Sequence, residues 1–208
     1  MFSQRLSVVT LSVISLIFAS TFSANAAPEP AFTLVRSGDG FEIRDYPELV
    51  IAKTLSDEGD NDAFRRLFAY ISGANEGERE ISMTAPVLVS EGVEIEMTTP
   101  VLGATVWNGS GGTEMAFILP EDYSSDTAPI PKDPLVSLAV IPARRVAVAT
   151  FSGWAGESDF AEAEADLRAR LTAANIRTAE VSETAQYNPP WTLGPFRRNE
   201  VIIPVAAD

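Results

Sequence analysis

The chain has 208 residues, of which 46% are apolar and 21% are charged, which is sufficient for the core of one globular domain. It contains no Cys and no His, which excludes disulfides, Cys/His zinc sites and Ser-His-Asp or Cys-His catalysis, so we expect a binding protein and not an enzyme. The formal net charge of -14 disfavours nucleic acid and anionic lipid as partners.

The first 26 residues have the features of a secretory signal peptide. Arg5 is followed by an apolar run over 6–22, and Ala24-Asn25-Ala26 supplies the small-x-small pattern of a cleavage site. The alternative is an uncleaved membrane anchor, which fits less well because the run is shorter and more polar than a usual bilayer-spanning helix. We therefore predict a signal peptide over 1–26 and one exported domain over 27–208. That domain is expected to be periplasmic or secreted, without a membrane span, and monomeric.

Short apolar runs between Gly-, Pro- and Ser-rich breaks predict strands along the whole exported domain. The predicted strand segments are 32–35, 41–44, 49–52, 81–101, 115–119, 136–141, 146–151, 176–181 and 200–205. A Gly- and Asp-containing turn over 37–40 joins the first two strands as a hairpin.

Helical spacing of apolar residues predicts two helices. The first covers 62–71 with Asn61 as N-cap, and the second covers 159–174 with Ser158 as N-cap. The predicted buried stripes are Phe64, Leu67, Phe68 and Ile71 in the first helix and Phe160, Ala163, Leu167, Leu171 and Ala174 in the second. In the second helix, Glu164 and Arg168 are placed for an i,i+4 ion pair.

The two halves of the chain share a pattern. The spacing from Pro47 to Ala52 equals that from Pro142 to Ala147, and a Gly- and acid-containing loop and a helix follow each pair. This repetition predicts a duplicated strand–strand–helix–strand unit. Two such units would form one curved antiparallel sheet or barrel with the helices outside.

Several segments resemble the SOUL heme-binding proteins. The similar segments are FEIRDYP at 41–47, MTAPV at 83–87 with an echo at 97–101, FILP at 117–120, FSGW at 151–154, YNPPW at 187–191 and PFRRNEV at 195–201. They occur in the family's order and span nearly the whole exported domain. The resemblance implies an α+β fold, a distorted antiparallel β-barrel with two flanking helices built from two pseudo-symmetric halves. It also implies a shallow apolar site for heme or a related tetrapyrrole near the first helix.

The same resemblance implies non-covalent heme as the cofactor and a small apolar ligand as the partner. A His axial ligand has been proposed for some members of the family, and this chain has no His. In other members, heme is held by apolar contact and by basic side chains at the propionates. The basic positions of animal members fall near Asn61 and Ala69, and Arg65 lies between them on the same helix face as a substitute.

Five residues are the predicted ligand contacts: Arg65, Tyr70, Tyr187, Trp191 and Arg197. On the last strand, Arg198 and Glu200 share a face and are expected to form a structural pair, which leaves Arg197 for a propionate. Tyr187 and Trp191 form either an aromatic wall for a flat ligand or a rigid plug of the barrel end. Tyr70 is the phenol nearest the expected site.

No metal site is predicted. Met83, Met97 and Met115 are soft donors, but their strand positions favour core packing. The acidic run over 57–62 lacks the spacing of a calcium loop. Heme would therefore bind without a strong protein ligand to its iron, and protoporphyrin should bind about as well as hemin.

Two other functions fit less well. A generic effector-binding module for apolar or cationic compounds would need a carboxylate in its cleft, and Glu42, Glu94 and Glu96 are strand residues that could supply one. An enzyme acting on a tetrapyrrole or a lipid-like substrate would need a constellation of polar residues that the sequence does not reveal.

Overall fold

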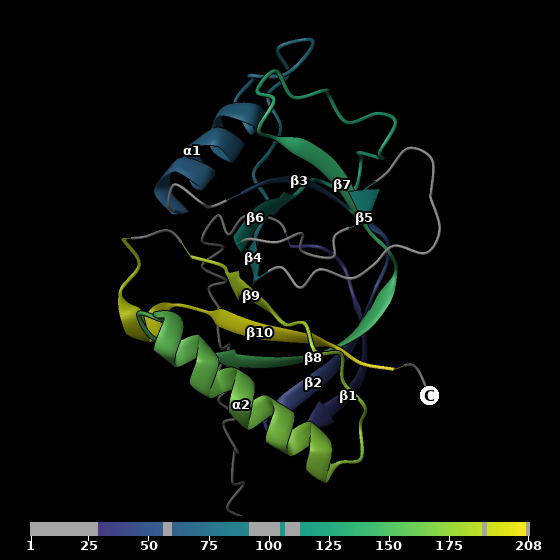
Figure 1. Cartoon of the computed structure of the whole chain (residues 1–208), viewed down its shortest axis with the longest axis vertical. Helices are drawn as coiled ribbons and strands as arrows, with labels where there is room; N and C mark the ends of the chain where they lie inside the picture. Colours follow the sequence, from purple (N-terminus) through teal and green to yellow (C-terminus); the bar gives the residue numbers. More distant parts are fainter. Residues whose placement is uncertain (1–28, 56–59, 92–104, 107–112, 189–190, 207–208) are drawn as a thin grey trace, which may run out of the picture.

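One strongly curved sheet forms the body of the protein, and two helices lie outside it (Figure 1). The computed structural model describes residues 29–55, 60–91, 105–106, 113–188 and 191–206. The elements in chain order are β1 (Thr33–Gly38), β2 (Phe41–Tyr46), β3 (Leu49–Leu55), α1 (Asp60–Ile71), β4 (Val87–Glu91), β5 (Thr105–Val106), β6 (Thr113–Ile118), β7 (Ser137–Ile141), β8 (Arg144–Phe151), α2 (Glu157–Ala173), β9 (Glu183–Gln186), the 3-10 turn η1 (Gly194–Phe196) and β10 (Asn199–Pro204). The predicted α+β fold, a distorted barrel with two helices, is confirmed.

The strand order is β1-β2-β8-β10-β9-β4-β6-β3-β7-β5. Neighbouring strands are antiparallel except β5 and β7, a short parallel pair that the antiparallel prediction did not include. The consecutive strands β2 and β3 are not neighbours in the sheet. After Pro47 the chain leaves β2, which pairs with β8, and enters β3, which pairs with β7. The two halves therefore complete each other's sheet. The duplication of the sequence itself stays a prediction.

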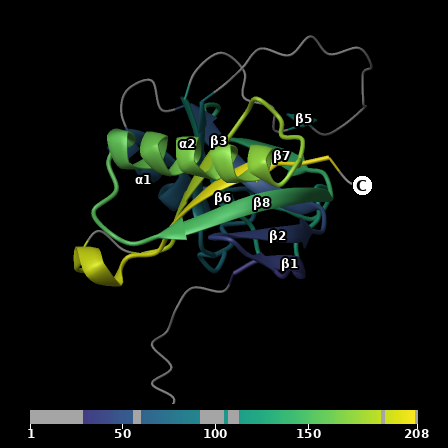
Figure 2. The ribbon, with the colours of Figure 1, turned by 90° about the horizontal axis from the view of Figure 1, so that it is seen from below.

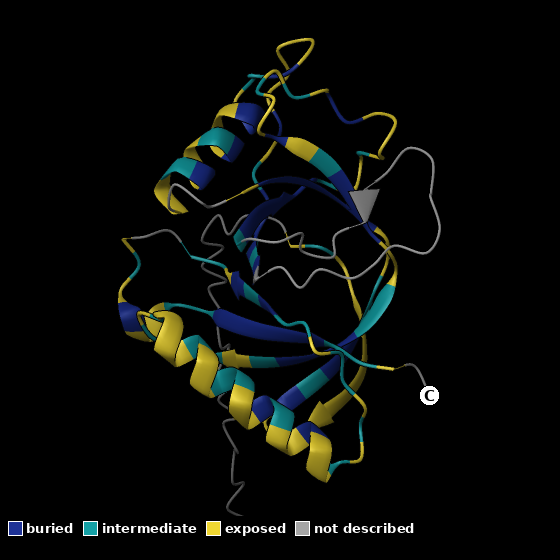
Figure 3. Ribbon diagram, viewed as in Figure 1, coloured by how far each residue is buried: buried dark blue, intermediate teal, exposed yellow. Residues whose placement is uncertain are grey.

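Residues on both faces of the central strands are buried, which is why apolar residues occupy successive positions in 49–52 of β3 and 201–203 of β10 (Figure 3). On β3, Ile51 joins the cluster inside the curl, whereas Ala52 joins the cluster beneath α1. On β10, Ile202 lies inside, whereas Val201 and Ile203 pack under α2. The alternation follows from the two-residue period of a strand.

Helix α1 lies over β3 and β6 but is rotated from the predicted orientation. Leu67 and Tyr70 are among its buried residues, while Phe64 and Phe68 stay 37% and 48% exposed. The predicted stripe was therefore wrong for both Phe residues. The helix buries the face centred on Leu67, and the two rings stack at its edge with centroids 6.0 Å apart.

Helix α2 lies on the outside of β8 and β10, where Figure 2 shows it crossing the strands. Its predicted apolar stripe and the Glu164–Arg168 pair, at 2.7 Å, are confirmed. The N-cap was predicted wrongly, since the helix begins after Gly156, whose N–H donates to the Asp159 carboxylate at 2.8 Å.

Two strand predictions were wrong. Of the predicted segment 81–101, residues 81–86 form no strand, β4 begins at Val87, and 92–101 lie outside the described residues. In 176–181 only Thr178 makes a β-bridge, to Val205, and the strand that reaches the sheet is β9, two residues further along. β9 pairs with both β10 and β4 and joins the two halves. No helix in the described part of the chain is long and apolar enough to cross a membrane.

Candidate functional site

A charged network lies inside the curl of the sheet, centred on the fully buried Glu200 of β10. Arg44 of β2 donates to both Glu200 oxygens at 3.2 Å. The Tyr187 hydroxyl donates at 2.5 Å, Arg198 at 2.8 Å and Thr150 at 3.2 Å. Arg44 and Thr150 lie on β2 and β8, whereas Tyr187 directly follows β9 and Arg198 directly precedes β10. The sheet topology thus brings together residues as far as 156 positions apart. The predicted Arg198–Glu200 structural pair is confirmed.

Burial and hydrogen bonding act against each other in this network. Burial alone would raise the pKa of Glu200, but the donors Tyr187, Arg44 and Arg198 outweigh it and lower that pKa below its ordinary value. Burial and the neighbouring Glu200 carboxylate raise the pKa of Tyr187. Glu200 is thus held as an anion and Tyr187 as a neutral donor.

Two further ion pairs lie inside the curl. Lys53 of β3 contacts Glu114 of β6 at 2.8 Å, with both side chains less than 10% exposed. Arg144 of β8 holds Glu183 of β9 by two contacts of 2.6 Å. The Nε atom of Arg144 is buried and has no hydrogen-bond partner among the described residues.

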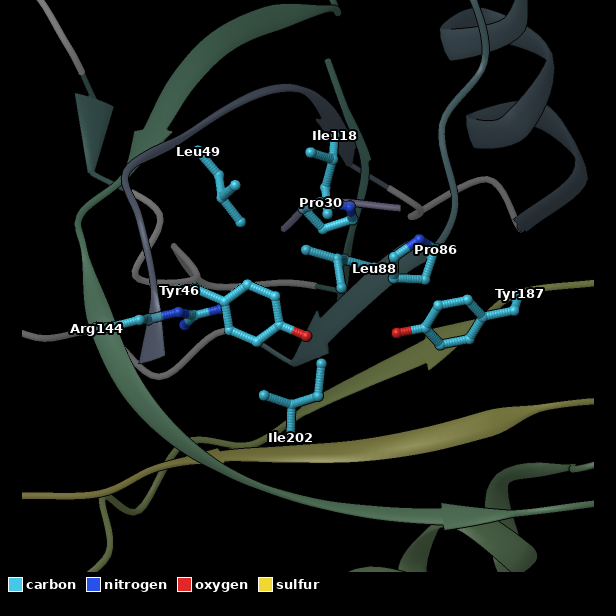
Figure 4. Close-up of a pocket in the computed structure, with 9 residues that line it drawn as sticks. All are labelled: Pro30, Tyr46, Leu49, Pro86, Leu88, Ile118, Arg144, Tyr187 and Ile202. Atoms are coloured by element: carbon cyan, nitrogen blue, oxygen red, sulfur yellow. The ribbon is translucent and has the colours of Figure 1, made fainter. Parts of the chain in front are cut away.

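An interior pocket, lined in part by Arg144, lies beside the second of these pairs (Figure 4). Its apolar lining is Pro30, Leu49, Pro86, Leu88, Ile118 and Ile202. The rings of Tyr46 and Tyr187 enter from opposite sides, with their hydroxyls pointing toward one another, and Arg144 lies beside Tyr46. The cavity of about 20 Å³ has room for roughly one water molecule.

Residues 29–31, which we call the N-terminal strap, cross the mouth of this pocket. Glu29 accepts from Arg198 at 2.9 and 3.0 Å, and the Ala31 N–H donates to Glu121 at 3.2 Å. Pro30 lies between, against the pocket.

A larger hollow, the rim groove, lies on the other side of Pro30. Its volume is about 620 Å³, within the range of small-molecule sites. Its apolar wall includes Leu49, Val50, Ile118 and Leu119, and its carboxylates are Glu29, Glu48, Glu121 and Asp122. The groove therefore combines an apolar wall with a negative rim.

A second candidate site, the aromatic surface, consists of Trp154, Trp191, Leu193, Phe196 and Arg197. Its four apolar side chains are 63–81% exposed, with Trp191 at 81% and Phe196 at 75%. The Trp154 ring packs on Gly194, where a Cβ would lie 2.6 Å from ring atoms, and the Arg197 guanidinium lies 4.2 Å from the ring centroid. Such exposure of clustered large apolar side chains is typical of a binding surface.

The structure separates the five predicted contacts. Trp191 and Arg197 belong to the aromatic surface, whereas Tyr187 lies inside the curl on Glu200. Arg65 is 77% exposed on α1, where it contacts Asp62 at 3.3 Å. Tyr70 is buried beneath α1 and donates to the Pro129 carbonyl at 2.8 Å, and its burial raises the pKa of the phenol to about 12.

Sequence reasoning missed Arg44, Trp154 and the strap. Arg44 and Trp154 lie in the similar segments 41–47 and 151–154, which was the available signal, but strand alternation could not tell which partner each would meet. For Glu29 no signal existed.

The described residues contain no group of three or more His, Cys, Asp or Glu placed to hold a metal ion. Met115 is buried and Met83 packs at the edge of the cluster under α1, which confirms their predicted core role. Met97, Glu94 and Glu96 lie outside the described residues. Glu42 contacts Arg44 at 2.6 Å on the half-exposed edge of the network.

Comparison with known proteins decides the family. The sequence pattern of the SOUL heme-binding protein family matches residues 27–204. The chain belongs to this family. Among its relatives, Heme-binding protein 1 of Xenopus tropicalis is 26% identical over 173 residues, which cover 80% of this chain and 84% of that protein. Heme-binding protein 1 of Sus scrofa is 26% identical over 151 residues, 70% of each chain.

The SOUL fold of this chain also resembles a domain of a differently named protein. The crystal structure of the EcmrR C-terminal domain superposes with a TM-score of 0.56 at 11% identity, covering 81% of this chain and 98% of that domain. At that identity the likeness concerns the fold alone.

Proposed function

We propose that this SOUL protein is an exported binder of heme or a related tetrapyrrole and that the macrocycle lies on the aromatic surface. The observation that carries the proposal is the exposure of Trp191, Leu193 and Phe196 on a short turn beside Arg197. Flat apolar ligands pack on such rings, and a guanidinium pairs with a propionate carboxylate. Family membership supports heme as the ligand.

Apolar contact supplies most of the proposed affinity. Burying ~300 Å² of apolar area contributes on the order of 7 kcal/mol before the ordering costs of association are subtracted. The net affinity is therefore roughly micromolar. The phenols of Tyr70 and Tyr187 already hydrogen-bond to protein groups, so neither supports ligation of the iron.

The first prediction concerns affinity for hemin. Titration of the purified protein should give a saturable shift of the Soret band, with protoporphyrin bound about as tightly as hemin. Trp191→Ala should weaken both ligands about tenfold, through lost ring contact, and Arg197→Ala roughly threefold to fivefold, through one exposed ion pair.

Arg65→Ala is the matched control, since it removes an exposed Arg from α1 and should leave both affinities unchanged. Loss of affinity in Arg65→Ala but not in Arg197→Ala would move the macrocycle to α1, beside Phe64 and Phe68. A hemin preference above about a hundredfold would show that the iron is ligated, and no saturable change with either ligand would reject heme binding.

Export is the second part of the proposal. The basic start, the apolar run over 6–22 and the Ala24-Asn25-Ala26 pattern support it, and the family match begins at residue 27. When the full chain is expressed in a Gram-negative host, the periplasmic fraction should contain a protein whose mass corresponds to a start at Ala27. A product that keeps its first 26 residues and stays in the cytoplasm would reject the proposal.

The alternative, an effector-binding module for cationic apolar compounds, is favoured by the rim groove, whose volume of about 620 Å³ and carboxylate rim suit such ligands. The same titrations distinguish the two functions. Thermal stabilisation by a cationic dye without any response to hemin would select the alternative.

A further inference from the structure

The N-terminal strap lies against the interior pocket and presents the same groups as a small amphiphilic acid. Its carboxylate, Glu29, makes both contacts to one nitrogen of Arg198, and its apolar ring, Pro30, lines the cavity. Phe32 continues the contact, with its ring 5.5 Å from that of Tyr46. The strap is thus a tethered carboxylate followed by an apolar group.

Charge makes a carboxylate the natural occupant of this position. Arg198 shares the Glu200 carboxylate with the buried Arg44, which also contacts Glu42 at 2.6 Å, so Arg198 does not have the Glu200 carboxylate to itself. Glu29 supplies a second carboxylate to Arg198. Its removal without replacement would leave Arg198 with half of a shared partner, and an incoming carboxylate would restore the balance.

The pocket also holds an unused donor. The buried Nε–H of Arg144, a pocket-lining residue, has no acceptor among the described residues. Such buried donors are rare and are usually satisfied by water or a ligand. A head group or a water held beneath the strap would satisfy it.

Pro30 divides the pocket from the rim groove, because it lines both, as do Leu49 and Ile118. Lifting Pro30 would join the roughly one-water cavity to the hollow of about 620 Å³. An apolar tail could then lie on Leu49 and Ile118 with its carboxylate at Arg198, whose guanidinium sits 3.9 Å from the centroid of the Tyr187 ring that walls the pocket.

We propose that the interior pocket and the adjoining groove form a binding site for an amphiphilic carboxylate, separate from the aromatic surface, and that the N-terminal strap closes this site by presenting Glu29 to Arg198. Ligand and strap compete for the same Arg. The apparent affinity is therefore reduced by the fraction of molecules in which the strap is closed.

The test uses decanoate as the probe and Glu29→Gln as the variant. Glu29 and Arg198 are about one-third exposed, so their pair is of the exposed kind, and its loss should tighten decanoate binding about fivefold. Asp166→Asn is the matched control, because it removes an exposed carboxylate that pairs with Arg170 on α2 and lines neither the pocket nor the groove, so the affinity should stay unchanged. Methyl NMR signals of Ile118 and Ile202, which line the pocket, should shift on binding.

Two further arms make the outcome decisive. Decanol, which lacks the carboxylate, should bind Glu29→Gln at least tenfold more weakly than decanoate, and equal binding would refute the role of Arg198. Decanoate that binds neither protein, or binds both equally, would refute the strap. Hemin affinity should be the same with and without Glu29. If decanoate displaces hemin and Glu29→Gln tightens both, the pocket holds a heme propionate and the separate site is wrong, whereas heme binding itself stands.

Discussion

Replacing Glu200 by Gln should lower the free energy of unfolding by about 3 kcal/mol, because it removes a fully buried carboxylate and leaves the buried charge of Arg44 with only the partly exposed Glu42. Arg44 has a side chain only 4% exposed and makes two hydrogen bonds to Glu200. Gln preserves the shape of Glu and one acceptor oxygen, so the decrease in the free energy of unfolding measures the contribution of the negative charge. Urea denaturation with linear extrapolation gives the quantity directly.

Asp45→Asn is the matched control. Asp45 also forms a two-point pair with an Arg, Arg145, at 2.7 and 2.9 Å, but at the solvent-exposed end of β2. Water screens that pair, so its loss should cost much less. Equal losses in the two variants would mean that the buried network contributes no more than a surface ion pair.

The pH dependence of stability provides a second measure of Glu200. Its folded pKa lies below the ordinary value of 4.5, so the carboxylate stabilises the fold above its unfolded pKa, and that contribution is lost as the pH falls through its folded pKa. The stability difference between the wild type and Glu200→Gln should therefore be constant near neutral pH and shrink below about pH 5. A difference that grows on acidification would contradict the assignment.

Substitutions of Lys53 and Glu114 should have strongly non-additive effects on the free energy of unfolding. Lys53→Met leaves Glu114, 4% exposed, as an uncompensated anion whose Oε2 already lacks a partner, and should cost about 3–5 kcal/mol. Glu114→Leu leaves the buried ammonium and should cost a similar amount. The double variant should recover most of the loss, since apolar side chains of similar volume replace both charges.

Urea denaturation of the wild type, the two single variants and the double variant completes this double-mutant cycle. Recovery in the double variant identifies mutual neutralisation as the role of the pair. Losses that simply add would show that each side chain acts through other partners, and Lys53 has a further interaction of its own.

The sequence predicted those helices and strands in which apolar residues recur with a regular period. The β3 run from Leu49 and the stripe of α2 through Leu167 and Leu171 are apolar at one fixed period, so their buried faces follow from the sequence alone. The sequence did not predict β9, because Glu183–Gln186 contains a single buried apolar residue, Ala185. This segment is a strand only because it pairs with a neighbour on each edge.

The candidate site was less predictable because its contacts are non-local. Trp191 and Arg197 were found together since they are close in the chain. The Arg44–Glu200 contact spans 156 positions and the Glu29–Arg198 contact 169, and no spacing rule encodes either. Tyr70 appeared accessible from its helical position, but α1 is rotated so that the phenol faces inward, onto Pro129.

The exchange of strands between the halves sets the order in which the chain can fold. β2 needs β8, β3 needs β7 and β4 needs β9, so the first half keeps three open strand edges until residues beyond 137 have been synthesised. Pairings of such long sequence separation form slowly, and neither half has a complete sheet to fold alone. The chain therefore completes its sheet only when its last strands are available, and this delay is compatible with the export proposed above.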